Sequence, residues 1–117
     1  MRVVIVDDEW FGLDVTYRLL TQIRMDLEVV AFFQDPMEAL EKIPALKPDL
    51  IILDMEMPYI NGIEVYEKLK GLRSRFLLVT AHGESLMKFD AINQQIMILT
   101  KPFCKSDMSA VLQALEF

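Results

Sequence analysis

The segment LIILDMEMP, residues 50–58, runs from four apolar residues directly into an acid, Asp54, with a second acid, Glu56, two places further on. An unbroken apolar run of this length is typical of a strand that is buried on both faces, as in a parallel sheet. Burying a carboxylate is unfavourable unless the group has partners or a chemical task. The segment therefore predicts a central strand and a functional residue at its end.

Three other short apolar runs, residues 3–6, 76–79 and 96–99, predict further buried strands. A fifth run, LEVVAFF from Leu27, contains a glutamate and is typical of an edge strand. Segments with helical periodicity separate the runs, so that a strand followed by a helix is repeated five times. This order predicts an α/β fold, a three-layer sandwich around a parallel sheet with right-handed crossovers.

The helices are predicted from apolar residues that recur on one face and from residues that start or stop helices. Pro36 suits a first helical turn, Pro48 interrupts the chain before the third strand, and Gly62 opens a segment that ends near Gly71. The apolar faces are Phe11, Val15, Leu19 and Ile23 in the first helix, Leu40 and Ile43 after Pro36, Tyr66 and Leu69 after Gly62, and Met108, Val111, Leu112 and Leu115 in the last.

Length and composition are those of one globular domain, which we place at residues 1–117. The net charge of −6 argues against nucleic-acid binding by this domain. No apolar run approaches the roughly 20 residues that span a membrane, and the N-terminal run is too short for a signal peptide. A single cysteine, Cys104, fits a reducing compartment. We therefore expect a cytoplasmic protein that does not bind membranes.

Polar residues follow four of the predicted strands. Asp7 and Asp8 come after the first, Asp54 after the third, Thr80 after the fourth, and Lys101 after the fifth. Ligands of open α/β sheets bind at the carboxyl ends of the strands, so these five side chains should converge on one edge. Packed carboxylates repel one another, and Mg²⁺ prefers such oxygen ligands together with a phosphate. The pattern predicts a magnesium site that handles a phosphoryl group.

The same residues indicate how that group would be handled. Asp54, at the end of the central strand, can act as a nucleophile and become an aspartyl phosphate. Lys101 is a compact positive charge that can pair with one phosphoryl oxygen, and Thr80 can donate a hydrogen bond to another. Alone, Asp7 and Asp8 could merely cap the first helix, and Lys101 could be a solvated surface residue. Their joint occurrence with Asp54 favours the functional interpretation.

The whole chain resembles the receiver domain of two-component response regulators. The resemblance lies in VVIVDDE (residues 3–9), PDLIILDMEMPYINGIE (48–64), LLVTAH (77–82) and LTKPF (99–103), in that order and spacing. It implies a flavodoxin-like fold with five helices and a five-stranded sheet of order 2-1-3-4-5. It also implies a regulatory domain rather than an enzyme, which a sensor histidine kinase phosphorylates.

Carried over position by position, the resemblance makes Asp54 the phosphoacceptor, Thr80 the switch hydroxyl and Lys101 the lysine that pairs with the phosphoryl group. It also implies that the Lys101–Pro102 peptide bond is cis. Family members often carry an aromatic residue three places before the lysine, whereas this chain has Ile98. Isoleucine is stiff and smaller than a ring, so we expect Ile98 to keep one rotamer and the signal to pass through residues 81–92.

For the metal, the resemblance implies that Asp8 binds Mg²⁺ directly and that Asp7 binds it largely through water. Asp54 and the backbone carbonyl of Glu56 complete the predicted protein ligands. The output would be a homodimer or a docked partner on the face formed by residues 81–92, the strand at 96–99 and the last helix. The resemblance leaves open whether an effector domain, such as a transcriptional one, follows this domain.

Two other functions fit parts of the pattern. Haloacid-dehalogenase-like phosphatases also use an aspartate nucleophile, Mg²⁺, a Ser or Thr and a lysine, but in a D-x-D pattern after the first strand. Here the first strand precedes the adjacent pair Asp7–Asp8, and the D-x-E pattern follows the third. The other alternative is a receiver-like interaction module that is never phosphorylated, against which the intact acid cluster argues.

Overall fold

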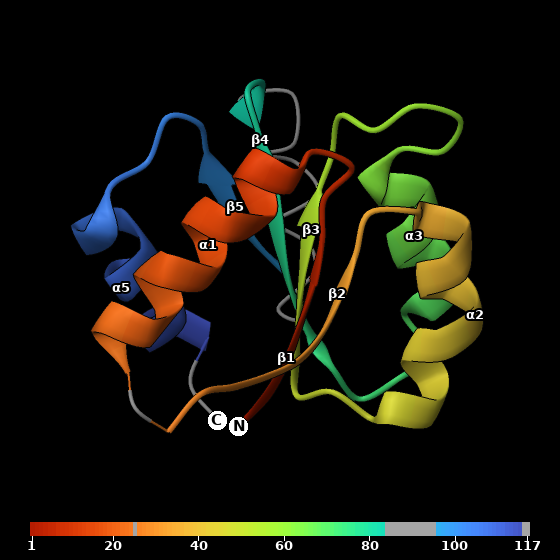
Figure 1. The fold of residues 1–117 in the computed structure, drawn as a ribbon, viewed down its shortest axis with the longest axis horizontal. Coiled ribbons are helices and arrows are strands. Elements are labelled where there is room, and N and C mark those ends of the chain that lie inside the picture. The colour runs from red at the N-terminus through yellow and green to blue at the C-terminus, as the bar shows by residue number, and fades with distance from the viewer. Residues whose placement is uncertain (25, 84–95, 116–117) are drawn as a thin grey trace.

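The computed structural model describes residues 1–24, 26–83 and 96–115. All five strands of its single sheet are parallel and follow the order β2-β1-β3-β4-β5, as the resemblance implied (Figure 1). The strands are β1 (Arg2–Val6), β2 (Glu28–Phe33), β3 (Leu50–Asp54), β4 (Arg75–Thr80) and β5 (Ile96–Thr100). The predicted edge strand is β2, and β3 lies at the centre of the sheet.

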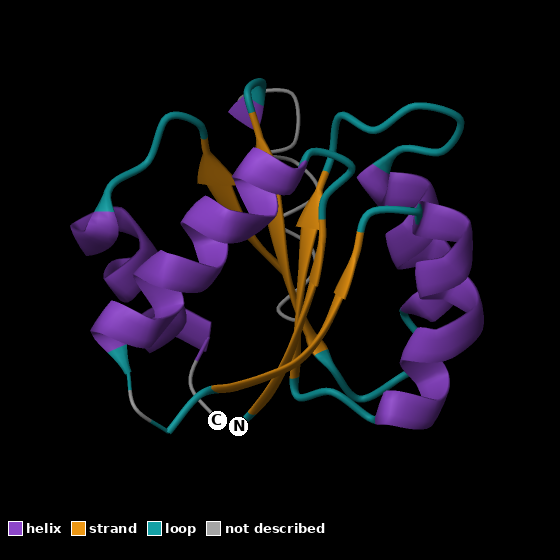
Figure 2. Ribbon diagram, viewed as in Figure 1, coloured by secondary structure: helices purple, strands orange, loops and turns teal. Residues whose placement is uncertain are grey.

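Helices cover both faces of the sheet and make it the middle of three layers (Figure 2). In Figure 1, α1 (Trp10–Ile23) and α5 (Lys105–Leu115) lie on one face, and α2 (Pro36–Leu46) and α3 (Gly62–Leu69) on the other. These are four of the five predicted helices within the described part of the chain. The helix expected within residues 81–92 falls, from residue 84 onward, outside the described residues.

The sheet separates two apolar cores. One core joins α2 and α3 to the sheet through side chains such as Ile43, Val65 and Phe76. The other joins α1 and α5 through side chains such as Leu20, Leu77 and Leu112. Every residue of β3 is buried, as the segment LIILD predicts, so Asp54 ends a strand that is enclosed on both faces.

The apolar face predicted for α1 is wrong in part. The helix buries Leu13, Thr16 and Leu20, whereas Phe11 is 75% exposed and the other members of the predicted face are half-buried. Residues four apart advance about 40° around a helix beyond one full turn, so a run of four such residues winds away from the sheet. The buried set is spaced by three and then four residues, which keeps it on one line.

Local signals explain where two helices begin. Asp35 caps α2 by accepting a hydrogen bond from the Met37 N–H, and Pro36 occupies the first turn as predicted. Asn61 and Glu64 form a capping box at the start of α3. Among the helices that the structure describes, none combines the length and the apolar composition needed to cross a bilayer.

Candidate functional site

The register of the parallel strands brings their carboxyl ends to one edge of the sheet. Val6 pairs with Leu53, Asp54 with Val79, and Thr80 with Thr100. Backbone pairing continues one residue beyond β5, because the Lys101 N–H donates to the Thr80 carbonyl at 2.7 Å. The polar side chains predicted to follow these strands are therefore neighbours in space.

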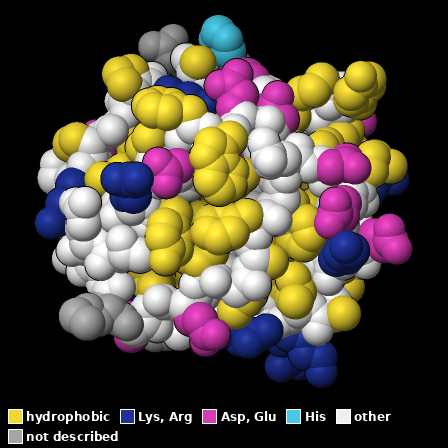
Figure 3. All heavy atoms as spheres, in the orientation of Figure 1, with side chains coloured by type: hydrophobic (Ala, Val, Ile, Leu, Met, Phe, Trp, Pro, Cys, Tyr) yellow, Lys and Arg dark blue, Asp and Glu magenta, His cyan; other side chains and the backbone are white. Residues whose placement is uncertain are grey.

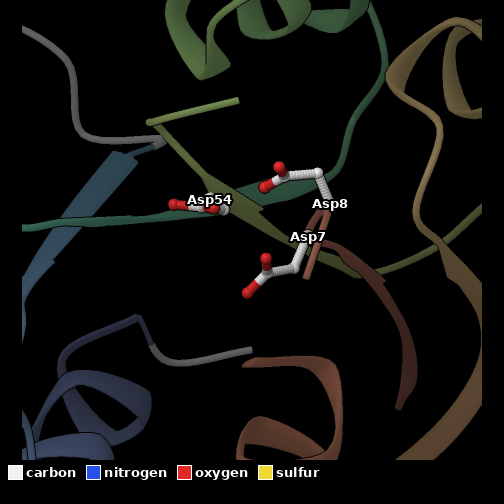
Figure 4. A group of neighbouring side chains, drawn as sticks. All are labelled: Asp7, Asp8 and Asp54. Carbon is white, nitrogen blue, oxygen red and sulfur yellow. The ribbon is translucent and has the colours of Figure 1, made fainter. Parts of the chain in front are cut away.

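Asp7, Asp8 and Asp54 form a compact cluster of acids. Each offers one carboxylate oxygen, and the three oxygens lie within 4.8 Å of one another. Two of the side chains extend from the end of β1 and one from the end of β3, toward a common space (Figure 4). Asp7 and Asp54 are buried, and Asp54 is only 5% exposed. A group of this kind is suited to a hard cation with oxygen ligands.

The first turn of α1 leaves room for Asp7 because residue 12 is glycine. A Cβ atom at Gly12 would stand 2.0 Å from Asp7 Oδ2, which is far inside contact distance. Asp7 Oδ1 meanwhile accepts a hydrogen bond from the Glu9 N–H at 2.9 Å. Sequence reasoning did not identify Gly12, because its role depends on how closely the helix approaches the acid.

Lys101 lies against Asp54, the acid at the end of the central strand. Its Nζ atom donates a hydrogen bond to Asp54 Oδ1 at 3.0 Å. The same oxygen accepts a second hydrogen bond from the Glu56 N–H at 3.3 Å. The Lys101–Pro102 peptide bond is cis, as the resemblance implied. A cavity of about 330 Å³ adjoins this pair and reaches apolar residues of the sheet, including Ile52 and Val79. The Asp54–Lys101 pair thus lines part of a partly apolar pocket.

Thr80 is engaged in a way that the sequence did not indicate. Its hydroxyl donates to Glu56 Oε2 at 2.8 Å, and Glu56 Oε1 accepts from the Ala81 N–H at 2.6 Å. The resemblance implies a role only for the backbone carbonyl of Glu56. In the structure, its side chain also links the end of β3 to the end of β4. Side-chain contacts across a sheet edge of this kind carry no short-range sequence signal.

Burial and repulsion by Asp54 raise the pKa values of Asp7 and Asp8, the two acids that follow β1. Burial, opposed by the hydrogen bond from Glu9 and aided by the charge of Asp54, raises the pKa of Asp7 from 3.8 to about 6. Burial and the charge of Asp54 also raise the pKa of Asp8. Burial opposes the charged form of Lys101, but the hydrogen bond to Asp54 and nearby negative charges outweigh it and raise the pKa of the ammonium.

Comparison with known proteins identifies the family. The family model described as "Response regulator receiver domain" matches residues 3–113. The chain belongs to this receiver family. Receiver domains are regulatory phosphoacceptor switches of two-component signalling, so the alternative of a phosphatase is not favoured.

Individual relatives agree with this assignment. The receiver domain is 31% identical to the chemotaxis protein CheY of Listeria monocytogenes over 119 residues, which cover 99% of this chain and 96% of that protein. It is 35% identical over 106 residues to a protein-glutamate methylesterase/protein-glutamine glutaminase of Thermotoga maritima. That match covers 87% of this chain but only 30% of the other, so this chain spans less than a third of that relative.

Solved structures of receiver domains have the same fold. The response regulator domain of Thermotoga maritima CheB superposes with a TM-score of 0.79 at 29% identity, covering 97% of this chain and 92% of that one. The signal receiver domain of a NarL response regulator from Mycobacterium tuberculosis also gives 0.79, at 32% identity, covering 97% and 94%. The flavodoxin-like architecture is thus shared along nearly the whole chain.

The residues of this receiver domain fit the Mg²⁺ that receiver domains hold in an acidic pocket. Asp8 Oδ1 is buried and has no hydrogen-bond partner among the described residues. A buried carboxylate oxygen without a partner is unfavourable unless a cation or water satisfies it. Together with the three converging carboxylates, this oxygen makes the site chemically complementary to a divalent cation.

The pKa of Asp7 predicts how the metal-free protein responds to pH. Because the folded-state pKa, about 6, lies above the ordinary value of 3.8, the folded protein binds the proton more tightly than the unfolded chain. This contribution to stability is complete below pH 3.8 and is lost as the pH rises through about 6. In EDTA, the stability of the wild type relative to Asp7→Asn should therefore fall between pH 4 and pH 7 in urea titrations. A difference that rises over this range would contradict the assignment.

Proposed function

We propose that Asp54 accepts a phosphoryl group from a sensor histidine kinase, and that the chain acts as a phosphorylation-dependent signalling switch. The observation that supports this most directly is the contact of 3.0 Å between Lys101 Nζ and Asp54 Oδ1 beside two further acids. A nucleophile, a positive charge for the incoming phosphoryl oxygens and a set of cation ligands thus meet at one edge of the sheet.

The proposed step is a phosphoryl transfer between two side chains. A carboxylate oxygen of Asp54 forms a bond to phosphorus while the bond from phosphorus to the kinase histidine nitrogen breaks. The leaving nitrogen keeps the electron pair, and because the other ring nitrogen of the phosphohistidine carries a proton, neutral imidazole and an acyl phosphate are the products. Lys101 pairs with a phosphoryl oxygen and offsets the charge that develops during transfer.

Mg²⁺ would be held by Asp8 and Asp54, by Asp7 through water, and by the backbone carbonyl of Glu56. When bound, it supplies positive charge that offsets the repulsion between the carboxylates and the phosphoryl group. The buried Asp8 Oδ1 without a partner supports a direct contact for that residue. Thr80, which is 2% exposed at the end of β4, would donate its hydroxyl hydrogen to a phosphoryl oxygen after transfer.

An apolar surface beside the site supports a protein as the phosphoryl donor. Trp10 is 64% and Phe11 75% exposed, and both lie in the first turn of α1, which Glu9 separates from Asp7 and Asp8. Apolar side chains gather across the face of the molecule that carries α1 and β2 (Figure 3). Contiguous exposed apolar surface commonly marks a protein contact. We place the docking of the kinase on this face.

Further properties follow as proposals. We place the whole of residues 1–117 in one regulatory domain, in the cytoplasm, without nucleic-acid binding, membrane binding or enzymatic turnover beyond self-phosphorylation and autodephosphorylation. We also propose a homodimer on the face that β5 and α5 share with residues 81–92. Most of that last segment lies outside the described residues.

The proposed function is tested by incubating the protein with acetyl phosphate and measuring its intact mass. Wild type with Mg²⁺ should gain one phosphoryl group that is labile at alkaline pH, and Asp54→Asn should gain none. Wild type in EDTA should also gain none. Equal labelling of Asp54→Asn would move the acceptor elsewhere. Continuous turnover of small phosphate esters would instead support the phosphatase.

A further inference from the structure

The carboxylate of Glu56 joins two separate parts of the site. Glu56 belongs to the loop after β3, and its two oxygens accept hydrogen bonds from the Thr80 hydroxyl and from the Ala81 N–H, at 2.8 and 2.6 Å. The His82 N–H in turn donates to Thr80 Oγ1 at 3.0 Å. The end of β4 is therefore attached to the β3 loop through one side chain.

The one hydrogen that the Thr80 side chain can donate is already used in the hydrogen bond to Glu56. A threonine hydroxyl has a single donor hydrogen, and here it is directed to Glu56. Thr80 can donate to a phosphoryl oxygen on Asp54 only after the bond to Glu56 is broken. Hydrogen bonds to charged acceptors are stronger than neutral ones, although the exposure of Glu56 to solvent weakens this one.

We propose that Glu56 is a positioning residue, which holds Thr80 in the resting state and sets how readily Thr80 engages the phosphoryl group. This inference rests on the proposed function of Asp54 and adds a second residue that controls the same switch. Because Thr80 must break its bond to Glu56 before it can donate to a phosphoryl oxygen, that bond favours the unphosphorylated conformation over the phosphorylated one.

The charge of Glu56 offers a second route by which the residue could act. Glu56 lies close enough to Lys101 to help raise the pKa of that ammonium, so it also opposes the approach of an anion. The two routes differ in what they require: the positional route needs the Thr80 hydroxyl, whereas the electrostatic route does not. A double-mutant comparison separates them.

The test measures the affinity for beryllofluoride, a phosphoryl mimic, at saturating Mg²⁺, by fluorescence of Trp10 or by NMR. Glu56→Ala should bind beryllofluoride roughly tenfold more tightly than wild type, since the resting contact no longer competes. In a Thr80→Ala background, the same substitution should change the affinity little. The melting temperature of metal-free Glu56→Ala should fall, because the buried Thr80 hydroxyl loses its acceptor.

Glu9→Ala is the matched control, since it removes a negative charge beside Asp8 without touching Thr80. It should alter the affinity less than Glu56→Ala does. An unchanged affinity in Glu56→Ala would overturn the inference, and so would equal tightening with and without Thr80. A wild-type protein that binds no beryllofluoride would instead contradict the proposed function itself.

Discussion

Lys101→Met should slow the phosphorylation of Asp54 by acetyl phosphate roughly 10²- to 10³-fold, the range typical for losing one group that stabilises a developing negative charge. The substitution keeps an unbranched apolar stem but removes the ammonium that lies 3.0 Å from Asp54 Oδ1. The incoming phosphoryl group would then meet the acids without this positive charge. The initial rate of labelling, followed by intact mass at saturating Mg²⁺, gives the effect.

Lys101→Arg is the matched control for charge. It keeps a cation but replaces the compact ammonium with a planar fork, so we expect a rate between those of wild type and Lys101→Met. Mg²⁺ affinity measured in parallel shows whether the metal site survives each substitution. A labelling rate of Lys101→Met within threefold of wild type would remove Lys101 from the proposed mechanism.

Gly12→Ala should weaken Mg²⁺ binding roughly ten- to a hundredfold, the usual range when the support of a metal ligand is lost. The new Cβ would stand 2.0 Å from Asp7 Oδ2 and 2.8 Å from Asp7 Cγ, so the carboxylate must turn away from the cluster. Helix propensity alone would predict the opposite sign for stability, because alanine favours a helix over glycine by about 1 kcal/mol.

Gly71→Ala provides the control, because a Cβ at that position meets nothing within 4 Å. It should leave Mg²⁺ affinity unchanged. Titration of Mg²⁺ followed by Trp10 fluorescence compares the two variants, and the rise in melting temperature with Mg²⁺ provides a second readout. Equal Mg²⁺ affinities in Gly12→Ala and Gly71→Ala would show that the fit of Asp7 beneath α1 does not matter.

The central features of the fold follow from the sequence because they depend on local patterns. Apolar runs such as residues 50–53 predict strands without further information, and parallel pairing then places the carboxyl ends of the strands together. The positions of Asp7, Asp54, Thr80 and Lys101 follow from that rule without knowledge of any side-chain contact. The order of the strands within the sheet came from the family resemblance alone.

What the sequence did not reveal depends on distances between elements. Helix α1 lies so close to Asp7 that only glycine fits at position 12 without a clash. The rotation of the same helix about its axis leaves Phe11 exposed. The contact between Glu56 and Thr80 joins residues 24 positions apart and depends on two loop conformations. No periodicity or motif encodes these relations. The prediction for residues 81–92 stays untested, while Ile98 is half-buried against the core of α2 and α3.

The strand register also determines which changes in chain length the protein can tolerate. One inserted or deleted residue within β3 would shift Asp54 by about 3.3 Å and turn every later side chain of the strand to the opposite face. The turns at the other end of the sheet, residues 47–49 and 70–74, contain none of the proposed site residues. Within these turns, Ser74 is buried and donates to the Pro48 carbonyl, whereas Gly71 is exposed and a Cβ there meets nothing within 4 Å. An engineered insertion of a peptide tag or reporter domain should therefore be accepted at Gly71 and rejected within the strands.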